Sequence, residues 1–332
     1  MSSENTAGDW EIFRADMKPH DGLTRLPQAP PWRGGSRAQP KLLEPPPYDL
    51  DAERERGAPI VIQADVRHAI NAALLLRRPL LVTGKPGVGK SSIAYAVARQ
   101  LRMGAVIRWP ITSRSTVKGG LYDYDAIGRL NAIQSNDANA TLGDFVRLGP
   151  LGTALYPTTW PRVLLVDEID KGDLDLPNDL LDVLEEARFE IPELARAKEA
   201  TTSVRLWGTD QRGSIPAGQV VAEQFPFIVL TSNGEREFPP PFLRRCIRIT
   251  ILQPEEKVLT HIVQSHLRDL ASDEQSAVAD LVKRFLRERE KQELATDQLL
   301  AAVFLMTGKL GLASEVEREH VLRILYKALT TT

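Results

Sequence analysis

Residues 84–91, Gly-Lys-Pro-Gly-Val-Gly-Lys-Ser, have the residue types and spacing of an anion-binding loop. Glycines let the backbone turn tightly, so that several N–H groups point at one phosphate. The amphipathic segment that follows would add the positive end of a helix. Lys90 would then reach the outer phosphates of a nucleotide, and the Ser91 hydroxyl would bind Mg²⁺. The expected phosphate loop consists of Gly84, Lys85, Pro86, Gly87, Val88, Gly89, Lys90, Ser91 and Ser92.

A second group of candidate residues lies in the segment VLLVDEID, residues 163–170, where four apolar residues are followed by acids. A carboxylate at the end of a buried strand is costly unless it meets a cation. We therefore expect Asp167 to hold Mg²⁺ through water and Glu168 to polarise an attacking water molecule. The Asp-Glu pair favours a hydrolytic phosphate-loop protein over most small kinases and switch GTPases.

Two further segments carry candidate residues. In IVLTSNGERE, residues 228–237, an apolar strand ends at Asn233, which could touch the γ-phosphate or the attacking water. Ser-Asn-Gly is also a common turn sequence. Asn233 is therefore a candidate only because it follows the phosphate loop and the acidic pair in the chain.

In PPPFLRRC, residues 239–246, Arg244 and Arg245 suit a group that acts on the site of a neighbouring subunit. Such a group typically raises the rate by about 10³–10⁵. Surface salt bridges are the other interpretation of these arginines.

The elements that must position these residues follow from hydrophobic patterns. Short apolar runs at 80–84, 105–110, 162–170, 225–233 and 246–251 alternate with helical patterns. This alternation predicts an α/β fold with a mainly parallel sheet covered on both faces.

Other segments complete the expected fold. Residues 64–78 predict a helix that Pro79 ends, and its apolar face consists of Val66, Ile70, Ala73 and Leu74. Polar, turn-rich segments at 188–194, 203–209 and 218–224 predict hairpin insertions.

The chain divides into three expected regions: a Pro-rich arm at 1–50, a nucleotide-binding core at 51–253 and a helical lid at 254–332. The arm holds eight of the 23 prolines and is interpreted as flexible or extended. Its aromatic residues Trp10, Phe13 and Trp32 indicate that parts of it dock on this chain or a neighbouring copy. After Pro254 only helical patterns remain, which predicts a small all-helical domain.

The composition of the 332 residues, with 42% hydrophobic and 26% charged residues, is that of a soluble globular protein. A net charge of −2 gives no general attraction to nucleic acid or to a membrane. The single cysteine, Cys246, excludes an internal disulfide framework and is expected to be a small core residue. The N-terminus lacks a signal-peptide pattern and no apolar run reaches membrane-spanning length, so we expect a cytoplasmic protein without a membrane partner.

Taken together, these motifs resemble an AAA+ ATPase, and most closely the MoxR-like family. The phrases that carry the resemblance are RPLLVTGKPGVGKSS, RWPITSRST, LYDYDAIGRL, RLGPLGTAL, VLLVDEIDK, DLLDVLEE and TSNGEREFPPPFLRRC. The resemblance covers about residues 59–250, and the C-terminal region matches only in helical character. The resemblance implies a P-loop AAA+ three-layer core with a mainly parallel five-stranded sheet, ATP/ADP and Mg²⁺ as cofactors, and a generally hexameric ring with the nucleotide between subunits.

The resemblance also assigns roles by motif position. Asn233 matches the first sensor, and Arg245 matches the arginine of the family's LDRF-like segment, which makes it the preferred finger. Arg244 occupies a position that is often acidic in the family, so the assignment between the two arginines stays open. Residues 115–130 lie where the family carries an inserted element that faces the pore or a partner; a structural hairpin with buried tyrosines is the other interpretation.

The implied activity is that of a chaperone-like remodeller or activator, often working with a partner that carries a von Willebrand A domain. One departure qualifies it: Glu293 stands where related lids place a basic residue, with Lys291 two residues earlier. A slow-hydrolysing, ATP-dependent regulatory switch is therefore an alternative. A nucleic-acid-associated AAA+ motor is a second alternative, which the near-neutral charge disfavours.

Overall fold

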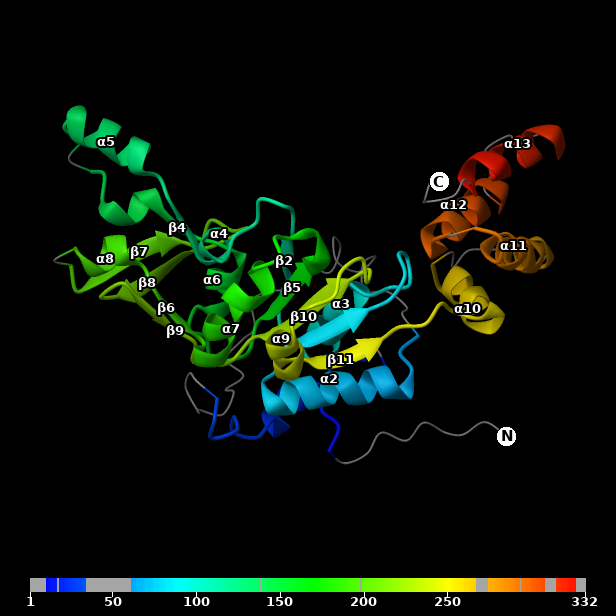
Figure 1. Cartoon of the computed structure of the whole chain (residues 1–332), viewed down its shortest axis with the longest axis horizontal. Coiled ribbons are helices and arrows are strands. Elements are labelled where there is room, and N and C mark those ends of the chain that lie inside the picture. Colours follow the sequence, from blue (N-terminus) through cyan, green and yellow to red (C-terminus); the bar gives the residue numbers. More distant parts are fainter. Residues whose placement is uncertain are drawn as a thin grey trace.

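The computed structural model describes residues 10–16, 18–33, 61–137, 139–197, 199–266, 274–292, 294–307 and 315–326. Glu293 lies outside the described residues. Figure 1 shows an α/β core in the middle of the long axis, an insertion that ends in helix α5 on one side and the helices α10–α13 on the other.

The core is built on a five-stranded parallel sheet, which confirms the α/β fold expected from the sequence. Its strand order is β11-β1-β10-β5-β2. The strands are β1 (Leu80–Thr83), β2 (Ile107–Pro110), β5 (Val163–Asp167), β10 (Phe227–Ser232) and β11 (Ile247–Thr250). Alternate residues of β5 enter different apolar clusters on the two faces, so the strand is apolar throughout instead of alternating.

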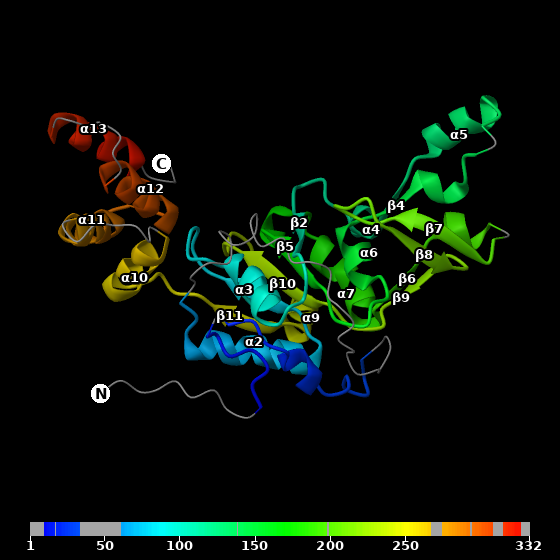
Figure 2. The ribbon, with the colours of Figure 1, turned by 180° about the vertical axis from the view of Figure 1, so that it is seen from behind.

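Helices cover both faces of this sheet. One face packs against α2 (Ala64–Leu76) and α3 (Ser92–Gln100), and the other against α6 (Pro150–Leu155) and α7 (Leu176–Glu186). Figure 2 shows α3 in front of the sheet, with α2 along its lower side. The short helix α9 (Pro240–Arg245) leads into β11.

The predicted apolar face of α2 is buried, as expected. The helix nevertheless ends before Pro79. Arg77 adopts a left-handed conformation, and its N–H bonds the carbonyl of Ala73. Burial lowers the pKa of Arg77 to about 10, and its guanidinium donates to the carbonyls of Leu74 and Pro27. The end of the helix is thus set by this capping arginine.

The polar hairpin segments lie outside the central sheet, as predicted. One small sheet contains β3 (Tyr122–Tyr124), β4 (Val146–Leu148), β7 (Thr201–Arg205) and β8 (Arg212–Pro216), and another pairs β6 (Arg188–Glu190) with β9 (Gln219–Val221). The helices of this part are α4 (Val117–Leu121), α5 (Ala126–Gln134) and α8 (Pro192–Ala195). The described residues also form the 3₁₀ turns η1 (Gly22–Arg25) in the arm, η2 (Leu142–Phe145) before β4 and η3 (Ile169–Lys171) after β5.

The described part of the N-terminal arm packs on the core instead of extending away from it. Phe13 is fully buried, whereas Trp32 is 72% exposed. The amide oxygen of Asn71, in α2, accepts the N–H groups of Ile12 and Phe13 at 2.7 and 2.8 Å. The flexible-arm interpretation is therefore wrong for this segment, and Phe13 is its anchor.

The C-terminal helices are α10 (Glu256–His266), α11 (Glu274–Arg289), α12 (Thr296–Thr307) and α13 (Glu315–Leu325). They enclose an apolar cluster of their own, with Leu259, Phe285 and Leu299 at its centre. Among the described residues, no helix combines the length and apolar character that crossing a membrane requires.

Candidate functional site

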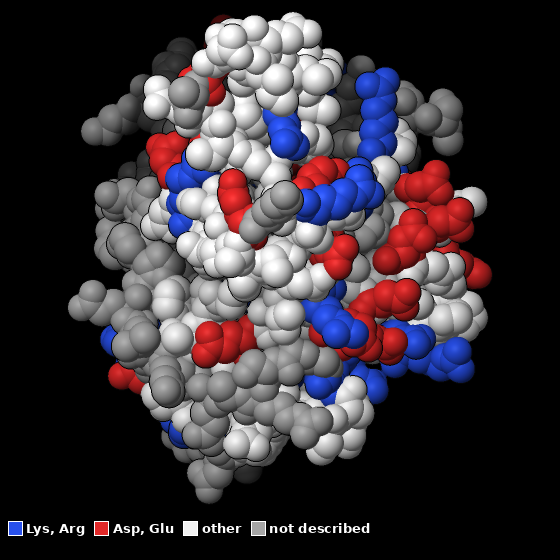
Figure 3. All heavy atoms as spheres, turned by 90° about the vertical axis from the view of Figure 1, so that its left-hand side faces the viewer, with Lys and Arg blue, Asp and Glu red and all other residues white. Residues whose placement is uncertain are grey.

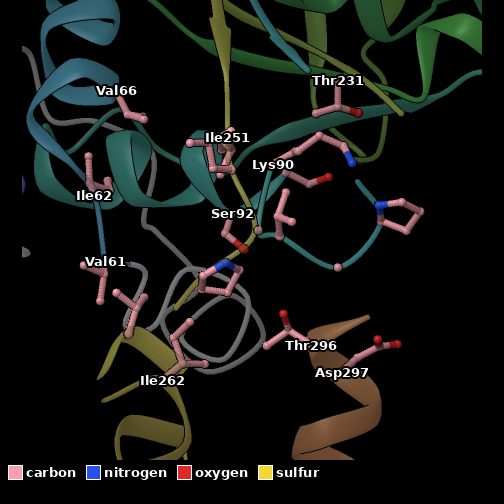
Figure 4. A pocket seen from close by; sticks show the side chains of 18 of the residues that line it. Val61, Ile62, Val66, Lys90, Ser92, Thr231, Ile251, Ile262, Thr296 and Asp297 are labelled. Atoms are coloured by element: carbon pink, nitrogen blue, oxygen red, sulfur yellow. The ribbon is translucent and has the colours of Figure 1, made fainter. Parts of the chain in front are cut away.

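A cavity of about 490 Å³ lies at the edge of the sheet where β1, β5 and β10 end. Parallel strands bring their carboxyl ends to one edge, so motifs far apart in the sequence meet there. Figure 4 shows Lys90 and Thr231 near one end of this cavity, and Val61, Ile62 and Ile262 near the other. The predicted residues that line it are Pro86, Gly87, Val88, Gly89, Lys90, Ser91, Ser92, Asp167, Glu168 and Asn233.

Glycine is required in the loop because neighbouring backbone approaches it closely. Gly87 has φ +74°, and a Cβ there would lie 2.6 Å from the Cβ of Ala295. A Cβ on Gly84 would lie 2.6 Å from the carbonyl oxygen of Ile251. These two contacts place the loop between β11 and the start of α12, so that it forms one wall of the cavity.

Lys90 is the cation of this wall. Its Nζ donates to the carbonyls of Gly84 and Lys85 at 2.7 and 2.9 Å and to Oδ1 of Asn233 at 2.7 Å. Burial lowers the pKa of Lys90, although the nearby carboxylates of Asp170 and Glu168 act in the opposite direction. The ammonium thus joins the phosphate loop to the predicted sensor.

Asp167 faces the loop from the end of β5. Its Oδ1 accepts the hydroxyls of Ser91 at 2.7 Å and Thr231 at 2.8 Å. Its Oδ2 accepts Nε and Nη2 of Arg108 at 3.1 and 2.6 Å. Burial works to raise the pKa of Asp167, but the hydrogen bonds from these three side chains outweigh it and hold the pKa below its usual value.

Glu168 follows in a left-handed conformation, with φ 60° and ψ 53°. Such backbone costs of the order of 1–3 kcal/mol for a residue other than glycine and is concentrated at functional sites. Its N–H donates to the hydroxyl of Thr231 at 2.9 Å, which fixes this turn to β10. Its carboxylate accepts Nζ of Lys171 at 2.7 Å, so the predicted base is paired within its own chain.

Asp170 holds the loop that carries Asn233. Its Oδ2 accepts the Ser232 hydroxyl at 2.9 Å and the N–H groups of Asn233 and Glu235 at 2.8 and 3.2 Å. Only 3% of Asp170 is exposed. It therefore sets the position from which Asn233 contacts Lys90.

Sequence reasoning missed Arg108, Lys171, Asp170 and Thr231 as parts of this site. Asp170 lies in the quoted acidic segment, and Thr231 directly precedes the Ser-Asn-Gly turn, so both had a local signal. Arg108 opens RWPITSRST, one of the phrases that carry the family resemblance, but no role was assigned to it. Its contact with Asp167 depends on the pairing of β2 with β5, which the sequence alone does not specify.

The cavity fits a nucleotide and a hard cation. Its apolar end could receive a planar base, and it includes Val61, Ile62, Val66, Val258, Ile262 and Leu300. Its polar end offers the Ser91 hydroxyl and the Asp167 carboxylate, which are the oxygen ligands that Mg²⁺ prefers. Its volume lies within the usual range of about 300–1,000 Å³ for ligand pockets.

The helical region contributes Thr296 and Asp297 to the cavity wall. Lys291, the suggested replacement for a basic sensor, is not among the lining residues and binds Glu288 at 3.0 Å. Among the described residues of α10–α13 that line the cavity, none is basic.

The two predicted finger arginines lie at the opposite edge of the sheet. The N–H of Ile247, which follows α9 closely, donates to the carbonyl of Pro79, just before β1 begins. Arg245 is ion-paired with Glu185, and its Nη2 lies 3.1 Å from Oε2 of that residue. Arg244 is exposed. Neither arginine lines the cavity of its own chain.

The family comparison agrees with the observed fold. Residues 79–246, half of the chain, match the AAA domain of the dynein-related subfamily. A solved candidate ATPase from Cytophaga hutchinsonii is 14% identical to the chain, with a TM-score of 0.37. The match covers 64% of this chain and 52% of the Cytophaga protein, so this chain spans about half the length of that protein. No curated protein matches the chain. The chain belongs to the family of AAA domains of the dynein-related subfamily.

Proposed function

We propose that the protein is a Mg²⁺-dependent ATPase of MoxR-like type, which works as an oligomeric, hexameric ring that remodels or activates a partner protein. The observation that carries the proposal is the meeting of Lys90, Ser91, Asp167 and Asn233 at one end of a single cavity. Glu168 borders the same cavity. These residues come from three separate parts of the chain and supply the phosphate-binding cation, the metal ligands, the sensor and the base that phosphoryl transfer to water uses.

The roles of the chain's residues follow from their contacts. Lys90 would turn its ammonium from the loop carbonyls to phosphate oxygens, and Ser91 would offer its hydroxyl oxygen to Mg²⁺. Bound Mg²⁺ would neutralise charge on the phosphates. Glu168 would take a proton from the attacking water only after its carboxylate leaves Lys171.

The pairing of Glu168 with Lys171 also favours a second candidate function, a regulatory switch that binds ATP and hydrolyses it slowly. The absence of a basic residue among the described cavity-lining residues of α10–α13 points the same way. The two candidates share a site and differ in turnover. The net charge of −2 disfavours a nucleic-acid motor. On the face seen in Figure 3, acidic and basic side chains of the described residues are mixed.

A ring would explain the position of α9. Its arginines lie at the sheet edge away from their own cavity, where they could serve only the cavity of a neighbouring copy. Arg245 would have to leave Glu185 to do so, whereas Arg244 is already exposed. Both therefore remain candidates for the finger.

A protein partner, for example one with a von Willebrand A domain, would explain α5. This helix buries none of its residues, and Ile127, Leu130 and Ile133 are 73%, 58% and 61% exposed. Figure 1 shows that α5 projects from the end of the molecule opposite to α10–α13. Exposed apolar residues at helical spacing mark a surface that another protein could cover.

Subunit mixing tests the shared site. Arg245→Ala subunits, inactive alone, are mixed with Glu168→Gln subunits, also inactive alone. A mixed ring places an intact Glu168 next to an intact Arg245, so we expect ATP hydrolysis to return. The same mixture with Arg244→Ala shows which arginine acts. If neither mixture regains hydrolysis while electron microscopy shows intact rings, the shared site is wrong.

A further inference from the structure

Arg108 lies beside Asp167 because of strand register. β2 and β5 are parallel neighbours, and Pro110 is paired with Asp167 while Arg108 is paired with Leu165. Side chains two residues apart on a strand share a face, and paired residues point to the same side of the sheet. Arg108 therefore faces the side of the sheet on which Asp167 meets Ser91. This strand position brings a permanent cation to the predicted metal site.

The contacts of Asp167 leave no acceptor position open. An ionised carboxylate offers about four lone-pair positions. Ser91 and Thr231 each donate to Oδ1, and Arg108 donates twice to Oδ2. A hydrated Mg²⁺ held by Asp167 through water needs at least one of these positions. One of the three donor side chains must therefore give way.

Arg108 is the donor that can leave. Thr231 is 1% exposed, lies within β10 and also accepts the N–H of Glu168. Ser91 can ligate a metal through a lone pair while its proton still points at Asp167. The Arg108 side chain is 50% exposed and long, and it already lines the cavity. Its departure would cost two hydrogen bonds but would disturb neither the loop nor the sheet.

We propose that Arg108 competes with Mg²⁺ for Asp167 and thereby sets how strongly nucleotide binding depends on the metal. The inference rests on the proposed nucleotide site. Arg108 and Mg²⁺ both supply positive charge next to the same carboxylate, so each makes the other less favourable. With Arg108 present, the protein holds a nucleotide with only modest help from the metal. Without Arg108, the metal becomes the main source of that charge.

The test measures binding of a fluorescent ADP analogue, mant-ADP, in EDTA and in saturating MgCl₂. The dissociation constant in EDTA divided by that in MgCl₂ gives the coupling between metal and nucleotide. We expect the ratio to rise roughly five- to twentyfold in Arg108→Gln, the effect of one charge in a half-exposed site. Arg108→Lys keeps the charge and should stay near the wild-type ratio.

The matched control is Arg102→Gln. The Arg102 side chain is 51% exposed and pairs with Asp21 at 2.8 Å. The substitution therefore removes a similar ion pair that does not border the cavity. We expect it to leave the ratio unchanged. If Arg108→Gln does not fold, Arg108→Met keeps the aliphatic stem and takes its place.

A ratio in Arg108→Gln that stays within twofold of wild type, or falls, overturns the inference while nucleotide binding itself stands. A rise that Arg108→Lys reproduces in full also overturns it, because the charge would then not be the cause. If wild-type protein binds no mant-ADP with or without MgCl₂, the proposed nucleotide site is wrong, and so is the inference that rests on it.

Discussion

At the residue scale, the charged groups at the polar end of the cavity are paired within the chain. Lys90 binds Asn233, Asp167 binds Arg108, and Glu168 binds Lys171. In the proposed reaction, Lys90 would exchange its present partner for phosphate, Asp167 would exchange Arg108 for the hydrated metal, and Glu168 would exchange Lys171 for water. These three contacts would therefore be replaced in the proposed reaction, whereas those of Asp170 and Thr231 would keep the site in shape.

The cysteine gives a residue-scale prediction. Cys246 is 7% exposed, and burial raises its pKa to about 12. Because only the thiolate reacts, we expect a disulfide reagent at pH 8 to modify native protein roughly a thousandfold more slowly than a free thiol. Unfolding in urea should restore the ordinary rate. Fast, stoichiometric modification of the native protein would show that Cys246 is not a core residue.

Sequence patterns could identify Lys90, Ser91, Asp167 and Asn233 because each lies directly at the end of an apolar strand or loop motif. They could not find Arg108, whose contact depends on a register between strands more than fifty residues apart. Nor could they decide the pairing of Glu168, because Lys171 is one of several nearby charges. Local motifs indicate which residues could take part in a reaction, whereas contacts between neighbouring strands can be identified only once the fold is known.

At the scale of elements, the inner strands β1, β5 and β10 were predictable because strands buried on both faces have continuous apolar runs, whereas the edge strands β2 and β11 are partly exposed. The segments that form β6, β9 and part of β7 were placed outside the central sheet because they are polar and rich in turn residues. The docking of the arm was not predictable. It depends on two polar side chains of α2, Asn71 and Arg67, which bind the backbone of the arm and Glu11, and the sequence did not show which partners they would meet.

The arm gives an element-scale prediction. Asn71 is fully buried, and Asn71→Ala would leave the N–H groups of Ile12 and Phe13 without their acceptor. We expect the free energy of unfolding in urea to fall by about 2–4 kcal/mol. Asn131→Ala, at an exposed position of α5, should change it by less than about 0.5 kcal/mol. Equal stabilities of the two variants would argue against a docked arm.

At the scale of the whole molecule, the three candidate functional surfaces face different ways. The cavity lies between the core and α10–α13, α9 lies at the opposite edge of the sheet, and α5 projects from the far end (Figures 1 and 2). Such an arrangement suits a head-to-tail contact between copies, in which one chain's α9 approaches its neighbour's cavity. A ring of these contacts leaves α5 available to a partner.

The most direct measurement of the central claim is ATP turnover in Glu168→Gln beside wild type, with binding of the nucleotide measured in parallel. We expect wild type to hydrolyse ATP only with Mg²⁺, and the variant to bind ATP but lose at least about a hundredfold in rate, because the proton acceptor is gone. Glu237→Gln, at an exposed acid outside the cavity lining, should keep the wild-type rate. Unchanged hydrolysis in Glu168→Gln, or wild type that binds ATP without turning it over, would contradict an ATPase built on these residues.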